Sequence, residues 1–216
     1  MIKIYKPTYN KLNNESKDLI TKLLENRLPI NHKLDGLINS YSKIKQTLNA
    51  ENELIEKLIL ALGGKIRFPR VGDNNERFDA FIEFEDYYSI VEIEIPSTTI
   101  LDAPRNLLDD YAVAVSRNKL DSKPIVPLVI CWDLPNKRTD YWNVVYDINQ
   151  ILGLKIKTIS IPALALHYWS NTPLDLQSDY YLDINNQTMD KSIDILKNLN
   201  FSTDIGIGYF EYINRF

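Results

Sequence analysis

Three acidic residues lie close together in a stretch of the sequence that has the pattern of paired β-strands. Residues 78–85 alternate apolar and polar side chains, which predicts a strand, and a tight turn leads to a second, β-branched strand at residues 89–95. Glu92 and Glu94 are two residues apart, so they point to the same face, and Asp79 on the partner strand can come near them. Buried carboxylates around one point repel each other, and a hard divalent cation such as Mg²⁺ or Mn²⁺ relieves that repulsion. The plainer alternative is a ribbon with one solvated acidic face.

An amphipathic helix precedes the hairpin and adds another acidic residue. Leucine and isoleucine form a stripe over residues 51–62, and the pair Gly63-Gly64 predicts the end of the helix. At about 100° per residue, Glu51 falls within the apolar stripe and is expected to face the sheet, while Glu53 is expected to face water. The alternative for Glu51 is a first-turn acid that the helix dipole favours.

The composition suits a single domain with its own core. The chain has 216 residues, a net charge of −4 and a hydrophobic share of 44%. No apolar run approaches the roughly 20 residues of a membrane span, and the N-terminus lacks the features of a signal peptide. The sequence has one cysteine, Cys131, which excludes an internal disulfide. With that single cysteine and two histidines, a zinc site is also disfavoured. We therefore expect a cytoplasmic protein without membrane contact. The negative net charge argues against a protein that coats nucleic acid nonspecifically, because such a protein would be basic. It is compatible with a protein that binds DNA through a local basic cleft.

The remaining patterns predict an α/β fold, with a mixed central sheet flanked by helices. Residues 1–49 are expected to form a helical extension with helices near residues 18–24 and 35–48. Residues 50–170 are expected to form the core, and residues 171–216 a C-terminal appendage to the same domain.

The segments after the hairpin predict a crossover from strand to helix to strand. A helix over residues 102–118 precedes the continuous apolar run of residues 124–132, which is typical of a strand buried on both faces. Residues 142–152 are expected to be helical and residues 156–165 to form a strand, which Pro162 places at the sheet edge. The expected apolar face of the helix at residues 102–118 consists of Leu107, Leu108, Tyr111 and Val115.

This order of elements between residues 50 and 135 resembles the core of the PD-(D/E)xK nuclease superfamily. The separation between Asp79 and Glu92 (92 − 79 = 13) is typical of that superfamily. The helix that opens at Glu51 looks like the first helix of archaeal Holliday-junction resolvases. The resemblance is greatest to type II restriction endonucleases with a Glu-x-Glu form of the motif, and it implies a restriction-endonuclease-like core.

The resemblance also implies roles for individual residues. Asp79 and Glu92 would be the ligands of Mg²⁺, with Mn²⁺ also compatible, and Glu51 would be an accessory acid. Two positions depart from the motif, since Phe78 stands where the motif has proline and Glu94 where it has lysine. Glu94 lacks the positive charge that would stabilise a transition state, but it could hold a second metal ion or position the attacking water. The same departure is compatible with an inactive site.

Three basic residues are candidates for contacts with DNA. Lys137 and Arg138 occupy a polar loop, where they could contact phosphates or base edges, although the loop reads equally as a surface turn. Arg105 could point into the site in place of the missing lysine, with helix capping or solvent exposure as the alternatives.

Taken together, these patterns predict a Mg²⁺-dependent endonuclease, most like a sequence-specific type II restriction enzyme. Such an enzyme commonly works as a homodimer whose symmetry matches a palindromic DNA site. The first alternative is an inactive nuclease-fold module that binds DNA or protein. The second is a metal-stabilised structural protein of a virus or mobile element.

Overall fold

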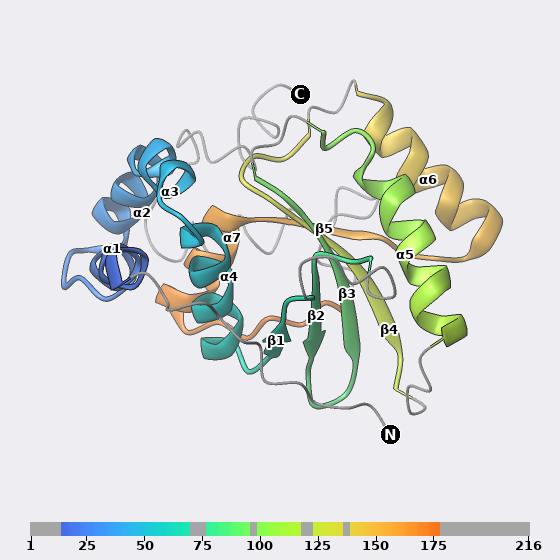
Figure 1. Ribbon diagram of the computed structural model, residues 1–216, viewed down its shortest axis with the longest axis horizontal. Coiled ribbons are helices and arrows are strands. Elements are labelled where there is room, and N and C mark those ends of the chain that lie inside the picture. The colour runs from blue at the N-terminus through green and yellow to red at the C-terminus, as the bar shows by residue number, and fades with distance from the viewer. Residues whose placement is uncertain (1–13, 70–76, 96–98, 118–122, 136–138, 178–216) are drawn as a thin grey trace.

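A mixed β-sheet forms the centre of the computed structural model, which describes residues 14–69, 77–95, 99–117, 123–135 and 139–177 (Figure 1). Within these ranges the sheet has five strands in the order β1-β2-β3-β4-β5. β1, β2 and β3 pair antiparallel, whereas β3, β4 and β5 pair parallel. The strands are β1 (Lys65–Arg67), β2 (Ala80–Glu83), β3 (Tyr88–Glu94), β4 (Ile125–Cys131) and β5 (Lys157–Ser160).

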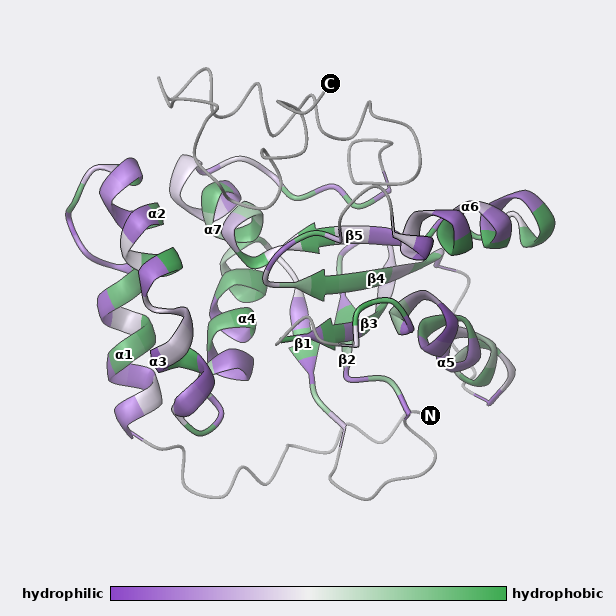
Figure 2. Ribbon diagram, turned by 90° about the horizontal axis from the view of Figure 1, so that it is seen from above, coloured by the Kyte–Doolittle hydropathy of each residue, from purple (hydrophilic) through white to green (hydrophobic). Residues whose placement is uncertain are grey.

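Helices cover both faces of the sheet, as Figure 2 shows from above. α4 (Ala50–Ala61) and α7 (Ile161–Ser170) pack with one face, and α5 (Ala103–Arg117) and α6 (Asp140–Leu152) pack with the other. The N-terminal helices α1 (Asn14–Leu24), α2 (Ile30–Asn39) and α3 (Tyr41–Gln46) pack against α4 and α7. The predicted mixed sheet with flanking helices and an N-terminal helical extension is confirmed. No helix of the described ranges is long and apolar enough to cross a membrane.

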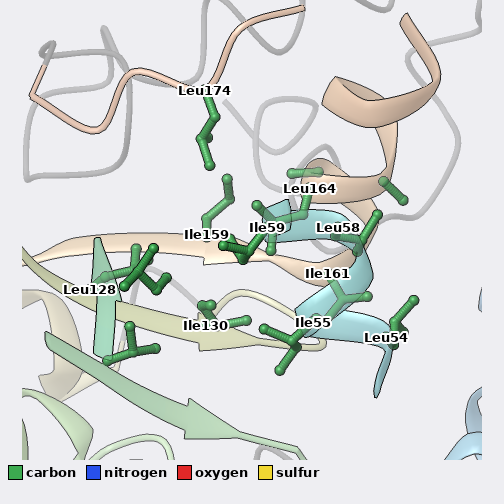
Figure 3. Packing of buried hydrophobic residues seen from close by; sticks show 14 of the residues in the cluster. Leu54, Ile55, Leu58, Ile59, Leu128, Ile130, Ile159, Ile161, Leu164 and Leu174 are labelled. Carbon is green, nitrogen blue, oxygen red and sulfur yellow. The ribbon is translucent and has the colours of Figure 1, made fainter. Parts of the chain in front are cut away.

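β4 is buried on both faces, as its continuous apolar run predicted. Leu128 and Ile130 pack with α4 and α7, alongside Ile55 and Ile159 (Figure 3). The alternate residues, among them Val129, pack with α5 and α6. Because the side-chain direction alternates along a strand, one apolar strand joins the two cores.

The predicted second helix of the extension is instead two helices, α2 and α3. They meet at Ser40, whose hydroxyl donates to the Gly36 carbonyl oxygen at 2.6 Å. A serine hydroxyl bonded to the preceding turn bends a helix, and the Asn39-Ser40 pair has low helix propensity.

The predicted strand over residues 156–165 was too long. β5 ends at Ser160 and α7 begins at the next residue. The Ser160 hydroxyl caps α7 by accepting from the Ala163 backbone N–H at 3.2 Å, and Pro162 lies in the first helical turn, where its missing N–H costs nothing. β5 does lie at the edge of the sheet, although Pro162 is not part of it.

Gly63 and Gly64 end α4 as predicted, each for a different reason. Gly63 has a φ of +89°, a left-handed conformation that favours glycine at a helix end. A Cβ on Gly64 would lie 2.7 Å from Ile59 Cγ2, 2.9 Å from Ile82 Cγ2 and 2.9 Å from Phe84 Cε1. The chain therefore needs glycine at position 64 so that it can pass between α4 and the sheet.

Gly64→Ala is expected to destabilise the fold by about 1–3 kcal/mol, because the added methyl group overpacks three buried side chains. Thermal unfolding measures the effect. Gly36→Ala is a matched control, since its Cβ meets nothing within 4 Å in a helix interior, and it should raise Tm slightly. An unchanged Tm for Gly64→Ala would contradict the close packing described here.

Candidate active site

The register of the hairpin brings Asp79 opposite Glu92. β2 and β3 pair with Ala80 opposite Val91, so the residue before Ala80 falls opposite the residue after Val91. The Asp79 backbone N–H donates to the Val91 carbonyl oxygen at 3.0 Å, which carries the ladder one residue beyond β2. The two carboxyl groups are close enough for the charge of Asp79 to act on Glu92.

Glu92 and Glu94 point to the sheet face that α5 and α6 cover. In the parallel pairing with β4, Glu92 lies beside Val129 and Glu94 beside Cys131, and both β4 residues belong to the core under these helices. Glu92 is 9% exposed and Glu94 is 5% exposed. The two glutamates are therefore buried, and the alternative of a solvated acidic face is wrong for them.

Each of the three carboxylates accepts a hydrogen bond from a neutral donor. The Ile93 backbone N–H donates to Asp79 Oδ2 at 2.8 Å, so the aspartate side chain continues the strand ladder where β2 has ended. Asn106 Nδ2 on α5 donates to Glu92 Oε1 at 3.2 Å. Thr99 Oγ1, before α5, donates to Glu94 Oε2 at 2.7 Å. These bonds fix the direction of all three carboxylates.

Glu92 is surrounded by other acids. Burial and the charges of Asp79, Asp110 and Glu94 together raise its pKa to about 7, while the hydrogen bond from Asn106 opposes the rise. Among the residues that the structure describes, the charges that shift this pKa are negative, so ionised Glu92 is disfavoured there.

The pKa values of the two neighbouring carboxyl groups are raised as well. For Glu94, burial is the main cause, the Thr99 hydroxyl opposes it, and the charges of Asp79 and Asp102 add to it. For Asp79, loss of water raises the pKa and the Ile93 N–H opposes the rise.

Helix α5 supplies two polar residues that the sequence analysis did not single out. Asn106 contacts Glu92, and Asp110, one turn later, is 6% exposed and acts electrostatically on Glu92. The expected apolar face of α5 is confirmed for Leu107, which is buried, and for Leu108 and Tyr111, which pack against the same core, but it is wrong for Val115, which is exposed. The residues that face the core are Ala103, Pro104, Leu107, Asp110 and Ala114.

A helical wheel could have found Asp110. Ala103, Leu107 and Ala114 recur at the spacing of one helix face, and Asp110 falls on that same face. The expected face followed the largest apolar residues, whereas the buried residues of α5 also include Ala103 and Ala114.

The chemistry of these donors fits a hard divalent cation. Mg²⁺ takes oxygen ligands, commonly one or two carboxylates with water in the other positions. Asp79 is exposed and lies beside buried Glu92, so this pair is open to solvent on one side. Within the described ranges, no three Asp, Glu, His or Cys side chains are grouped closely enough to hold a metal ion by themselves.

No family model and no curated protein matches this chain. Among solved structures, it is similar to the small subunit of the heterodimeric restriction endonuclease R.BspD6I. That match has a TM-score of 0.42 and 10% sequence identity, and it covers 84% of this chain and 96% of the subunit.

Glu51 lies apart from the other predicted site residues. It is half-buried in the first turn of α4, the helix that packs with the opposite face of the sheet. Burial raises its pKa, and the Lys45 charge opposes the rise. Burial raises the pKa of Tyr41, and the charges of Asp133 and Glu51 add to the rise. The structure therefore groups Glu51 with α3, and its role as an accessory acid stays a prediction.

Glu53 was expected to face water and is instead buried. It lies one turn before Lys57, whose Nζ donates to Thr21 Oγ1 on α1 at 2.6 Å and to Glu25 Oε1 at 3.2 Å. α1 thus covers the side of α4 that carries Glu53 and Lys57. The periodicity of α4 alone does not show that a second helix packs behind it.

Arg105 is engaged in ion pairs at the start of α5. Its Nη2 lies 3.0 Å from Asp140 Oδ2 and its Nη1 3.8 Å from Asp102 Oδ1, and about half of its side chain is exposed. The pair with Asp140 joins the first turns of α5 and α6. The predicted DNA contacts of Lys137 and Arg138 concern residues outside the described ranges.

Proposed function

We propose that the protein is a Mg²⁺-dependent endonuclease that hydrolyses DNA phosphodiester bonds, and that it acts as a sequence-specific type II restriction enzyme. The observation that carries this proposal is the pairing of exposed Asp79 with buried Glu92, whose pKa is raised by burial and by the negative charges of its neighbours. Two strand-borne carboxylates without a compensating charge are suited to a cation, and a cation at this position would lie within reach of a phosphate approaching from solvent.

Different residues of the site would bind the cation and position the attacking water. Asp79 and Glu92 would hold Mg²⁺ or Mn²⁺, and Asn106 keeps the Glu92 carboxylate in place. Bound Mg²⁺ would supply charge stabilisation to the phosphate and lower the pKa of a bound water. Glu94, held by Thr99 through its Oε2, offers its carboxylate as a base that positions the attacking water.

A second candidate function is binding of DNA or protein without cleavage. The observation that favours it is Glu94 itself, a buried acid at the position where the resemblance calls for a lysine. Without a positively charged side chain at position 94, β3 offers no direct partner for the negative charge of a phosphate transition state.

Recognition of a palindromic site would need two copies of the chain, so we propose a homodimer as the active form. The segments outside the sheet and its flanking helices are the candidates for DNA contacts beyond the catalytic residues. Residues 136–138 and 178–216, which include Lys137 and Arg138, belong to these segments.

Incubation of the full chain with supercoiled plasmid separates the two functions. The nuclease is expected to convert the plasmid to nicked, linear or fragmented DNA in Mg²⁺ and to leave it intact in EDTA. A plasmid that stays intact in both Mg²⁺ and Mn²⁺, but whose mobility shifts in EDTA, would favour the binding module.

A further inference from the structure

Asp110 is a buried carboxylate that the hairpin does not explain. It lies in the middle of α5, on the face that packs toward the sheet, and it is 6% exposed. In the part of the chain that the structure describes, no group hydrogen-bonds or ion-pairs with its side chain. A buried charge without a partner costs free energy, and aspartate is also a poor residue for a helix interior. Nothing in the packing of α5 requires an acid at this position.

Arg77, the basic residue whose charge acts on Asp110, forms its ion pair with a different aspartate. Burial and the charge of Asp109 raise the pKa of Asp110, and the charge of Arg77 only partly opposes the rise. The Arg77 Nη1 is bonded to Asp109 Oδ2 at 2.7 Å, and both of these side chains are more than half exposed, so the direct ion pair of Arg77 is with the neighbouring aspartate.

Asp110 lies on the side of α5 that approaches Asp79 and Glu92. Asn106, one helical turn earlier and so on the same side, donates to Glu92 Oε1 at 3.2 Å. The charge of Asp110 acts on Glu92, and the charge of Asp79 acts on Asp110. Asp110 therefore lies near the pair of Asp79 and Glu92, on the helix that also contacts Glu92 through Asn106.

We propose that Asp110 is a further residue of the cation site, where its carboxylate accepts hydrogen bonds from water molecules bound to the cation that Asp79 and Glu92 hold. This inference rests on the proposed function. Mg²⁺ keeps several waters when it takes one or two protein carboxylates, and those waters need acceptors. A partnerless buried carboxylate one turn from the residue that bonds Glu92 supplies such an acceptor.

Calorimetric titration of the full chain with Mn²⁺ alone, near pH 8, tests this role. Asp110→Asn is expected to weaken Mn²⁺ binding by about 10- to 100-fold, the loss typical of a residue that orients ligands around a metal. Asp147→Asn is the control, because it changes an exposed aspartate in the interior of the neighbouring helix α6, and it should bind Mn²⁺ as the wild type does.

Thermal unfolding in EDTA distinguishes a cation role from a structural one. Asp110→Asn removes a buried charge and should unfold at or above the wild-type Tm, whereas a clear loss of Tm would make Asp110 a structural residue and overturn the inference. Wild-type affinity for Mn²⁺ in Asp110→Asn would also overturn it, while leaving the proposed function intact. A wild-type chain that binds no Mn²⁺ would instead overturn the proposed function together with this inference.

Discussion

Asp79→Asn is expected to lose Mg²⁺-dependent DNA cleavage by about 100- to 1000-fold, the loss found when one group that stabilises a charged transition state is removed. Asparagine has the size of aspartate, and its Oδ1 can still accept the bond from the Ile93 N–H, so the hairpin should stay folded. Only the charge that would bind the cation is lost. The measurement is the initial rate of plasmid cleavage at saturating Mg²⁺.

The control for that experiment is Glu83→Gln. Glu83 lies at the other end of β2, paired with Tyr88, so the variant removes a carboxylate from the same strand but away from the acidic cluster. It should cut DNA at the wild-type rate. Wild-type cleavage by Asp79→Asn would show that Asp79 is not a ligand of the catalytic cation.

The metal-free protein is expected to lose stability as the pH rises from about 4.5 to about 7 because of Glu92, whose pKa burial and neighbouring acids raise from 4.5 to about 7. In this window the folded chain keeps a proton that the unfolded chain has released, so the free energy of unfolding falls with rising pH and levels off above pH 7. The shift corresponds to roughly 3 kcal/mol. Asp110, whose pKa is raised to about 6, acts in the same direction.

Comparison of the wild type with Glu92→Gln in EDTA isolates this contribution. Near pH 4.5 the two proteins should have similar Tm values, because Glu92 is then largely protonated in the folded chain. Near pH 8 the variant should unfold roughly 5–10 °C above the wild type, since it buries no charge at this position. Added Mg²⁺ should then raise the Tm of the wild type far more than that of the variant. A Tm difference that is the same at both pH values would contradict the account of Glu92.

The hairpin and the central strand could be predicted because their side-chain patterns are local. The alternation over residues 80–84, and the spacing of Glu92 and Glu94, determine which side chains share a face once two strands pair, whereas Phe78, which precedes β2, lies in the opposite core with Phe81. The apolar run of β4 likewise indicates burial on both faces without knowledge of what covers them.

The contributions of helices to the site and core depended on tertiary packing that a sequence pattern does not contain. Asp110 is buried because it lies on the face of α5 that packs toward the sheet, and Glu53 is buried because α1 covers α4. The position of Glu51 relative to the acidic cluster depends on which sheet face α4 covers. The start of α7 was missed although Ser160 followed by Pro162 is a local helix-start signal, because the apolar residues around them also suit a strand.

The most direct test of the central claim is to incubate genomic DNA with the full chain in Mg²⁺ and in EDTA and to sequence the ends of any fragments. We predict discrete fragments in Mg²⁺ whose ends share one short sequence, and intact DNA in EDTA. Intact DNA in both Mg²⁺ and Mn²⁺, from protein shown to be folded, would contradict the claim that Asp79 and Glu92 form the centre of a nuclease.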